Sequence, residues 1–322
     1  MVIATRGSAL ALAQAHQIKE ICEAAFPGVV FELKVMKTTG DRLQTASLAR
    51  PADSLPKGLF TKELEVALLA GEADLAVHSL KDLPTELPNG LRLGAVGSRA
   101  DVRDVLIYRG AKVPAASRGR RYGPGLSMGD LPSGATVATS STRRKSQLLA
   151  ARPDLRVIEI RGNVATRLRK LFEQEQIDAT ILAAAGLGRL RIEMQPDGEL
   201  RGGGVPEGFL GSVLSVETML PCVGQGALGI EVRAEDARAL EVCARLDHEE
   251  THRCVLAERA FLRAMGGGCQ SPVAALGRMK DSRLHLRAVS FQGGRMKAGE
   301  GVGLPASAEV LGQELAARLR EG

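Results

Sequence analysis

Short segments with the composition of β-strands alternate with helical patterns along most of this 322-residue chain. Residues 31–37 have the alternating, β-branched composition of a strand, and 59–69 repeat apolar residues at the spacing of an amphipathic helix. Strands that alternate with helices predict α/β architecture. The series occurs twice and a smaller α+β tail follows. Because the chain is too long for one ordinary core, we expect two or three domains.

The pattern also gives the bounds of the expected elements. Strands are expected at 2–4, 31–37, 73–77, 91–96, 136–139, 156–160, 179–184, 228–232 and 284–289. Helices are expected from residue 8 to about 26, at 59–69, 249–265 and 306–320, and after the turns 140–144 and 161–163. Two stretches rich in glycine and proline, 110–134 and 195–211, are predicted to be loops, the first of them an exposed, mobile insertion.

Composition limits the class of ligand and the compartment. The chain carries a net charge of +6, but only 3% of its residues are aromatic and it has no tryptophan, so small anions are better partners for it than single-stranded nucleic acid. Its five cysteines are widely spaced and include no C-x-x-C pair, which indicates a reducing compartment. No apolar run approaches the ~20 residues of a membrane span, and we identify no signal peptide at the start.

Basic residues follow the ends of several predicted strands, at or near the start of a helix. Ligands of open α/β sheets bind at this edge, and helix N-termini attract carboxylate or phosphate. Arginine grips carboxylates with a planar fork, and serine hydroxyl groups there add donors or cap the helices. Each arginine alone fits a solvated surface charge, but together they predict a site for a ligand with many carboxylates. The residues concerned are Arg6, Arg143, Arg144 and Arg161, extended by Arg167 and Arg189, with Ser8, Ser140 and Ser141.

One acid, Asp82, occupies a similar position after the strand 73–77, between Lys81 and the stiffening Pro84. A carboxylate among cations stays ionised, so it can stabilise a cationic intermediate or transfer a proton. A role as a turn former explains Asp82 equally well when it is considered alone.

Cys269 follows three consecutive glycines, 266–268, at the end of the apolar helical run 254–265. Glycines without Cβ atoms let other groups approach the thiol closely, which fits an attachment point presented into a cleft. A small buried cysteine in a flexible loop is the alternative interpretation.

Three further patterns imitate known sites. Residues 248–252 match H-E-x-x-H, but Asp247 and Glu250 fit a capping box, so we expect a helix start and no metal. Residues 224–229 match G-x-G-x-x-G, but a strand follows the glycines instead of preceding them, so we predict a crossing between domains in which Gln225 faces the cleft. His78 fits a hydrogen-bonded histidine at a strand end better than a general base.

Taken together, these segments resemble the hydroxymethylbilane synthase family, also called porphobilinogen deaminase, over nearly the whole chain. The matching motifs are Ala4-Thr5-Arg6-Gly7-Ser8, Lys57-Gly58-Leu59-Phe60-Thr61-Lys62-Glu63-Leu64, Ala76-Val77-His78-Ser79-Leu80-Lys81-Asp82-Leu83-Pro84, Thr139-Ser140-Ser141 with Arg143-Arg144, Arg161-Gly162-Asn163 with Thr166-Arg167-Leu168, Val223-Gly224-Gln225-Gly226-Ala227 and Gly267-Gly268-Cys269.

The resemblance implies a transferase of porphyrin and heme biosynthesis. Cys269 would carry a dipyrromethane cofactor, made from two substrate units, through a thioether. Four porphobilinogen molecules would be added in turn with loss of ammonia, and water would release the linear tetrapyrrole hydroxymethylbilane. Asp82 is the implied catalytic carboxylate, which handles the pyrrole N–H groups and the cationic azafulvene. The implied substrate- and cofactor-binding residues are Arg6, Ser8, Lys57, Lys81, Ser140, Ser141, Arg143, Arg144, Arg161, Gly162, Asn163, Arg167, Arg189, Gln225 and Gly268.

The family also implies three domains. The first two resemble type II periplasmic anion-binding proteins with mixed sheets, and the third is a small α+β domain that carries the cofactor cysteine. We predict their bounds as 1–100 with 225–246, 101–224, and 247–322. The stretches 110–134 and 195–211 are longer than is usual in the family.

Two other functions compete with this interpretation. A solute-binding protein would share the arginine-lined cleft but has no use for Cys269 or Asp82. A nucleic-acid-binding protein is suggested by the net charge and by residues 118–121, although that cluster is short and fits a solvated loop. We expect a monomer without nucleic-acid or membrane partners, which passes its product to uroporphyrinogen-III synthase. Its expected location is the cytoplasm, or a plastid or other organelle if a leader has been removed.

Overall fold

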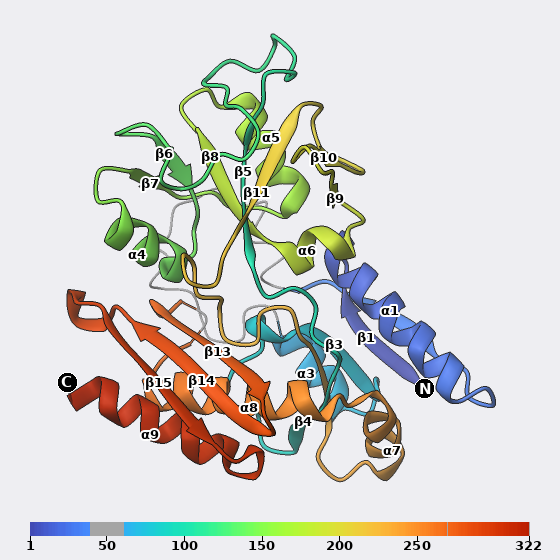
Figure 1. Ribbon diagram of the computed structural model, residues 1–322. Coiled ribbons are helices and arrows are strands. Elements are labelled where there is room, and N and C mark those ends of the chain that lie inside the picture. The colour runs from blue at the N-terminus through green and yellow to red at the C-terminus, as the bar shows by residue number, and fades with distance from the viewer. Residues whose placement is uncertain (39–60, 269, 322) are drawn as a thin grey trace.

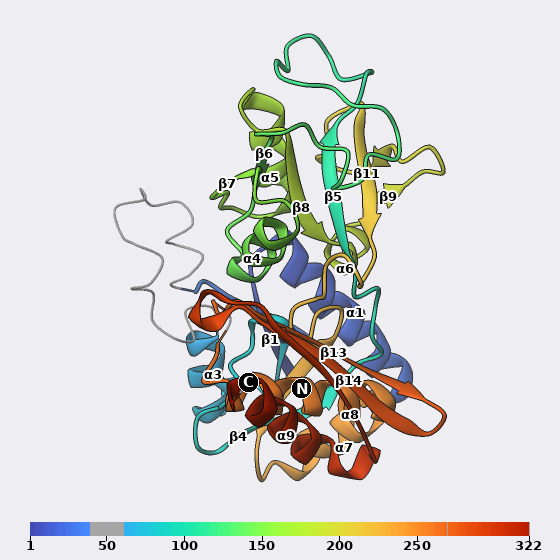
Figure 2. The same ribbon diagram turned by 60° about the vertical axis from the view of Figure 1, so that its left-hand side comes forward.

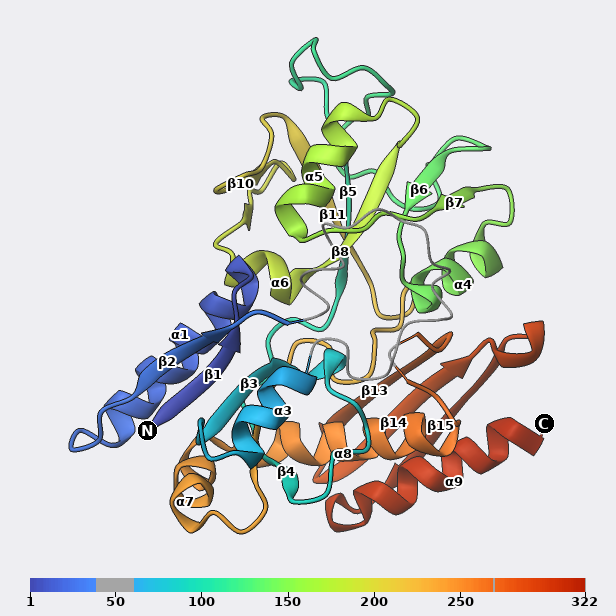
Figure 3. The ribbon, with the colours of Figure 1, turned by 180° about the vertical axis from the view of Figure 1, so that it is seen from behind.

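The computed structural model describes residues 1–38, 61–268 and 270–321. Within these residues the sheets are two of five strands, one of three and a two-stranded ribbon. Figures 1 to 3 show the second five-stranded sheet standing above the other two large sheets, which lie beside each other. The α/β class, the mixed sheets and the α+β tail are thereby confirmed, whereas the exact domain bounds stay a prediction.

The first sheet has the strand order β2-β1-β3-β12-β4. The first three strands are parallel, and β12 runs antiparallel between β3 and β4. Helix α1 (Ala9–Ala25) packs on this sheet because Ala11, Ala15, Ile18 and Cys22 recur at helical spacing and are buried. The strands are β1 (Val2–Arg6), β2 (Glu32–Met36), β3 (Leu75–Ser79), β4 (Leu91–Val96) and β12 (Leu228–Arg233), with helices α3 (Lys62–Leu69) and α7 (Ala237–Leu246).

The second sheet has the order β11-β5-β8-β6-β7. Strands β6, β7 and β8 are parallel, and β5 runs antiparallel to β8 and β11. The strands are β5 (Asp104–Arg109), β6 (Thr136–Ala138), β7 (Arg156–Ile158), β8 (Ala179–Ala183) and β11 (Phe209–Leu214). The helices are α4 (Thr142–Ala151), α5 (Val164–Glu173) and α6 (Ala184–Arg189), and β9 (Glu193–Met194) with β10 (Leu200–Arg201) forms the ribbon.

Two chain segments that lie beside each other connect these sheets. The Ala100 amide donates to the Gly226 carbonyl at 3.1 Å, and the Arg99 Nε donates to the Gln225 carbonyl at 2.9 Å. Gly226 has φ +88°, and a Cβ there would lie 2.5 Å from the Ala100 carbonyl oxygen. The G-x-G-x-x-G pattern is therefore a crossing between sheets, as predicted, and close backbone approach requires its glycine.

The third unit is an antiparallel sheet with two helices packed on it, and Figure 1 shows it at the lower left. Helix α9 crosses α8 at Gly312, where any Cβ would collide with the Ala257 carbonyl oxygen. The strands are β13 (Val273–Lys280), β14 (Arg283–Ser290) and β15 (Lys297–Gly303), and the helices are α8 (Glu249–Ala264) and α9 (Ala308–Glu321). Short 3₁₀ turns are η2 (Leu80–Asp82), η3 (Gln292–Gly294) and η4 (Pro305–Ser307).

Several sequence predictions need correction. The sequence analysis did not predict strands β5, β11, β13 and β15 or helix α7. Strand β5 was missed because it is buried along its whole length and lacks the alternation of a half-exposed strand. The predicted loop 195–211 contains β10 and the start of β11. The prediction that 110–134 is exposed is wrong for Leu126, Met128 and Leu131, which are buried in the core of the second sheet.

Arg109 explains how the 110–134 segment is held. Its guanidinium is fully buried and donates to the carbonyls of Arg120, Leu171 and Ile177. The Ser117 hydroxyl donates to the Phe172 carbonyl at 2.6 Å. The Leu171, Phe172 and Ile177 carbonyls belong to the end of α5 and the residues just after it, where backbone acceptors lack intrahelical partners.

Candidate functional site

One small cavity, of about 60 Å³, lies at the carboxyl ends of β1 and β3. Its walls include Arg6, Ser8, Ser79 and Asp82, which come from the strand ends and from the N-terminus of α1. Ser8 caps α1, since its hydroxyl accepts from the Ala11 amide at 3.3 Å. The predicted meeting of a basic residue, a hydroxyl and the acid at one sheet edge is therefore present.

Asp82 stands on the 3₁₀ turn η2, immediately after β3. Leu80 and Leu83 anchor this turn because both side chains are buried, at 1% and 2% exposed, while the Asp82 side chain faces solvent. The backbone closes the turn with a 3.2 Å hydrogen bond from the Leu83 amide to the Leu80 carbonyl. Apolar neighbours therefore fix the position of a polar group that stays accessible.

Lys81, beside it, has a pKa below the usual lysine value. Burial is the main cause and the nearby Arg144 charge adds to it, whereas the Asp82 carboxylate acts in the opposite direction. The carboxylate and Arg144 are thus both close enough to influence the same ammonium group.

Arg143 and Arg144, at the start of α4, converge on a buried acid that sequence analysis missed, Asp104. Arg143 donates to Asp104 at 2.9 Å, Arg144 donates to it at 2.8 and 3.2 Å, and the Gln225 amide adds a bond of 2.9 Å. Burial alone would raise the pKa of Asp104, but the two guanidinium groups outweigh it and hold that pKa well below its usual range. Gln225 is buried and its amide also donates to the Val102 carbonyl, so it belongs to this cluster, and its predicted role in binding stays a prediction.

This cluster keeps a surplus of positive charge, because two arginines share one carboxylate. The Nε atom of Arg143 is buried and has no hydrogen-bond partner among the described residues. An orphaned donor beside excess positive charge suits an anionic ligand group. The only sequence signal for Asp104 was a lone acid at the head of the apolar run 104–109, where a buried charge needs a partner.

The start of α5 supplies the next basic group. Asn163 caps the helix by accepting from the Thr166 amide at 2.9 Å, and Gly162 has φ +116° with no room for a Cβ beside Thr166. Arg167 donates from Nε to the Gly162 carbonyl at 2.9 Å. Burial, together with the Arg144 charge, lowers the pKa of Arg167 to about 10, and Asp82 opposes the shift. Arg167 therefore lies near both ends of the site.

The remaining predicted residues of the second sheet have other partners. Arg161 forms a 3.2 Å ion pair with Glu159. Ser141 caps α4, as predicted, but Ser140 hydrogen-bonds both backbone groups of Ile160 and caps no helix. Arg189 donates to the Gly226 carbonyl at 2.7 Å, and burial lowers its pKa to about 10.

Lys57 and Cys269 lie outside the described residues. The residues on either side of Cys269, Gly267–Gly268 and Gln270–Ser271, are described. Gly267 has no room for a side chain, since a Cβ would lie 2.7 Å from Leu262 and 2.8 Å from Ser271. The Ser271 hydroxyl accepts from the Gly268 amide at 2.8 Å, and the Ser271 amide donates back to the Gly268 carbonyl at 2.9 Å. Gly268 and Lys81 line one small cavity of about 20 Å³.

A second contact joins the loop to the other sheet, because the Thr142 hydroxyl at the start of α4 donates to the Gln270 carbonyl. On one flank of Cys269, Gly268 thus shares a cavity with Lys81, and on the other flank Gln270 contacts the start of α4.

The patterns that imitate other sites have structural explanations. His78 is buried and its Nε2 lies 3.0 Å from Glu231, as predicted for a hydrogen-bonded histidine. His248 caps α8, with its Nδ1 accepting from the Thr251 amide, so the Asp247–Glu250 capping box is wrong. Asp247 instead accepts from the Val96 amide at 2.7 Å.

Neither a cluster of three metal-ligating side chains nor a helix long and apolar enough to cross a bilayer occurs within 1–38, 61–268 and 270–321.

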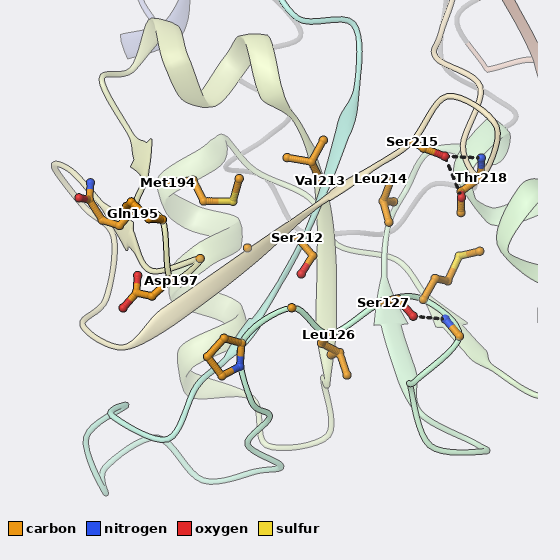
Figure 4. A pocket seen from close by; sticks show the side chains of 17 residues that line it. Leu126, Ser127, Met194, Gln195, Asp197, Ser212, Val213, Leu214, Ser215 and Thr218 are labelled. Carbon is orange, nitrogen blue, oxygen red and sulfur yellow. Dashed lines mark hydrogen bonds between the residues drawn. The ribbon is translucent and has the colours of Figure 1, made fainter.

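A larger hollow, of about 790 Å³, lies away from this site, between residues 124–129, the ribbon and β11 (Figure 4). Leu126, Met194 and Val213 are among its apolar walls, and none of the described predicted site residues lines it.

Comparison with known proteins agrees with the geometry. Residues 1–241 match the family model "porphobilinogen deaminase, dipyromethane cofactor binding domain", and 252–321 match the C-terminal domain model. The porphobilinogen deaminase of Desulforudis audaxviator is 48% identical over 100% of this chain and 94% of its own length, and that of Moorella thermoacetica is 44% identical over 98% and 92%.

Among solved structures, the sulphonate-binding protein SsuA of Escherichia coli aligns with 100% of this chain and 86% of its own, at 12% identity and a TM-score of 0.38. That likeness is too weak to support any functional inference. The two family models and the full-length relatives show that the chain belongs to the porphobilinogen deaminase family.

Proposed function

We propose that this protein is a hydroxymethylbilane synthase, which condenses four porphobilinogen molecules with loss of ammonia and releases the linear tetrapyrrole. The observation that carries the proposal is the meeting of Asp82, Arg6 and Ser8 in one cavity, while Gly268, the residue before Cys269, lines a second cavity together with Lys81. A solute-binding protein has no use for either the acid or the thiol.

The described residues fit a carboxylate-rich cofactor. The Arg143–Arg144–Asp104 cluster has surplus positive charge and one orphaned donor, and Arg167 and Arg189 stay charged at neutral pH because their pKa values, though lowered, are about 10. When bound through Cys269, dipyrromethane supplies the pyrrole end to which substrate units are joined. These arginines would hold acetate and propionate groups, as would Arg6 and Arg161.

Asp82 would perform the acid–base work. Ammonia leaves porphobilinogen only if its amine is protonated and the resulting cation is stabilised. An accessible carboxylate on a rigid turn can accept the N–H hydrogen bonds of the substrate pyrrole and balance that positive charge. Lys81 and Arg167 both lie close enough to the Asp82 carboxylate to interact with it.

Tethering the acceptor to one thiol makes each addition effectively intramolecular, which is worth several orders of magnitude in rate. The remaining proposals follow from the family: a monomer without nucleic-acid or membrane partners, located in a reducing compartment such as the cytoplasm, whose product passes to uroporphyrinogen-III synthase. The described cysteines Cys22, Cys222, Cys243 and Cys254 are all free, which supports the reducing compartment.

Intact-mass spectrometry tests the function. The purified protein should carry the mass of two linked pyrrole units on the peptide that contains Cys269, or gain it on incubation with porphobilinogen. Cys269→Ser should abolish the gain, whereas Asp82→Asn should keep the attached mass but turn over slowly. A protein that carries no added mass as purified and gains none after incubation would refute the synthase proposal and leave anion binding in its place.

A further inference from the structure

Arg259, on helix α8 of the third unit, reaches across to the turn that carries Asp82. Its side chain is 8% exposed; Nη1 donates to the Leu83 carbonyl at 3.1 Å and Nη2 to the Pro84 carbonyl at 2.6 Å. These carbonyls belong to the first and second residues after Asp82. One guanidinium therefore fixes the backbone directly behind the acid.

The same helix also supports the loop of Cys269. Helix α8 ends at Ala264, and the Gly267 amide donates back to the Leu262 carbonyl at 3.0 Å. The Leu262 side chain packs so closely that Gly267 has no room for a Cβ. Arg259 and Leu262 both line the small cavity that Gly268 shares with Lys81. Neighbouring turns of α8 therefore contact both the turn that carries Asp82 and the glycines that precede Cys269.

Glu258, the preceding residue, holds the helix in place. Its carboxylate is fully buried and accepts from Arg99 at 2.6 and 3.0 Å, from the Gly224 amide at 2.7 Å and from the Gly277 amide at 2.8 Å. These four bonds join α8 to both segments that cross between the sheets and to β13. The helix is therefore a fixed support, so Arg259 can transmit its position to the Asp82 turn.

We propose that Arg259 is a positioning residue, which sets the place of Asp82 relative to the cofactor loop by holding the Leu83 and Pro84 carbonyls against α8. The proposal rests on the function proposed above. It requires that Asp82 sit within hydrogen-bond reach of a substrate held on that loop, where a misplacement of about 1 Å typically costs about 100-fold in rate. Arginine suits this role because its planar fork binds two adjacent carbonyls at once, whereas a lysine ammonium acts as a point charge.

The test compares Arg259→Lys and Arg259→Gln with Arg263→Gln as the matched control. Arg263 lies one turn further along α8, is exposed, and makes only a 3.8 Å ion pair with Glu309 among the contacts that the structure records for its side chain. Each variant is assayed as full-length protein for attached mass, kcat and KM for porphobilinogen, and its unfolding midpoint. Amide hydrogen exchange of the peptide over residues 80–87 is followed with and without porphobilinogen.

We expect both Arg259 variants to keep the attached mass and to lose about 10- to 100-fold in kcat, the range seen when groups that orient functional residues are removed. KM should stay within about twofold, because the Arg259 guanidinium is engaged by the Leu83 and Pro84 carbonyls, and exchange over 80–87 should speed up. Arg263→Gln should match the parent in every reading.

Three results would overturn the proposal. The first is an unchanged kcat in Arg259 variants that are folded and carry the attached mass. A lower unfolding midpoint in such variants would then indicate a structural role only. The second is a raised KM with unchanged kcat, which indicates direct substrate contact. The third is unchanged exchange over 80–87. A parent protein that gains no mass and shows no turnover refutes the proposed function instead, and the exchange comparison still decides whether Arg259 fixes the turn.

Discussion

Replacing Asp104 with asparagine should destabilise the protein severely. The carboxylate is fully buried between Arg143 and Arg144, whose side chains are only 4% and 6% exposed. Asparagine keeps one acceptor oxygen but leaves two buried guanidinium groups without a counter-charge. Removing one partner of a buried ion pair costs about 3–5 kcal/mol. We expect the lower end, about 3 kcal/mol, which is a large part of the 5–15 kcal/mol that typically stabilises a domain.

Asp101→Asn is the matched control, because Asp101 makes the same kind of pair in an exposed place. Arg103 donates to Asp101 at 2.6 and 3.0 Å, with both side chains more than a third exposed. Exposed pairs contribute about 0–1 kcal/mol. Urea denaturation followed by far-ultraviolet circular dichroism measures both variants. Equal losses in the two variants, or a loss below about 1 kcal/mol for Asp104→Asn, would refute the argument that burial makes the difference.

The pH dependence gives an independent check. The pKa of Asp104 is lowered in the folded protein, so its contribution is complete above the unfolded value of about 3.9 and is lost as the pH falls through the folded value. The difference in unfolding free energy between the parent and Asp104→Asn should therefore be constant from about pH 5 to 8 and narrow below about pH 4. A difference that grows on acidification would contradict the assignment.

Three further predictions concern packing. Gly267→Ala should reduce the mass attached at Cys269, whereas Gly268→Ala, where a Cβ meets nothing within 4 Å, should not; intact-mass spectrometry separates them. Arg109→Lys should accelerate limited trypsin cleavage within 110–134 by about tenfold, because the lost hydrogen bonds lower the local stability by about 1.4 kcal/mol. An unchanged cleavage rate would show that Arg109 does not hold the segment. Burial raises the pKa of the Cys254 thiol to about 12, so iodoacetamide at pH 8 should leave it unmodified in the native protein but not in urea, as peptide mapping can show.

Prediction from sequence identified the features that depend only on residues close together in the chain. Strand β4 has the predicted bounds, and Ser8 and Ser141 cap the predicted helices, because caps and periodicity depend on neighbours along the chain. It failed for β5, whose burial on both faces removes the alternation that identifies a strand. It also missed Asp104, which binds Arg143, Arg144 and Gln225.

The sequence by itself determined the α/β class, the residue types of the site and their place at strand ends, since each strand, turn and helix start is a local unit. Only the tertiary structure decided which acids those cations meet. Asp104 lies 39 and 40 residues before the arginines that it binds, and Arg259 lies 176 residues after the Leu83 carbonyl that it holds. No local pattern encodes such pairs. They form because packing excludes water around charged groups, and a buried charge must then find a partner from whichever segment the fold brings beside it.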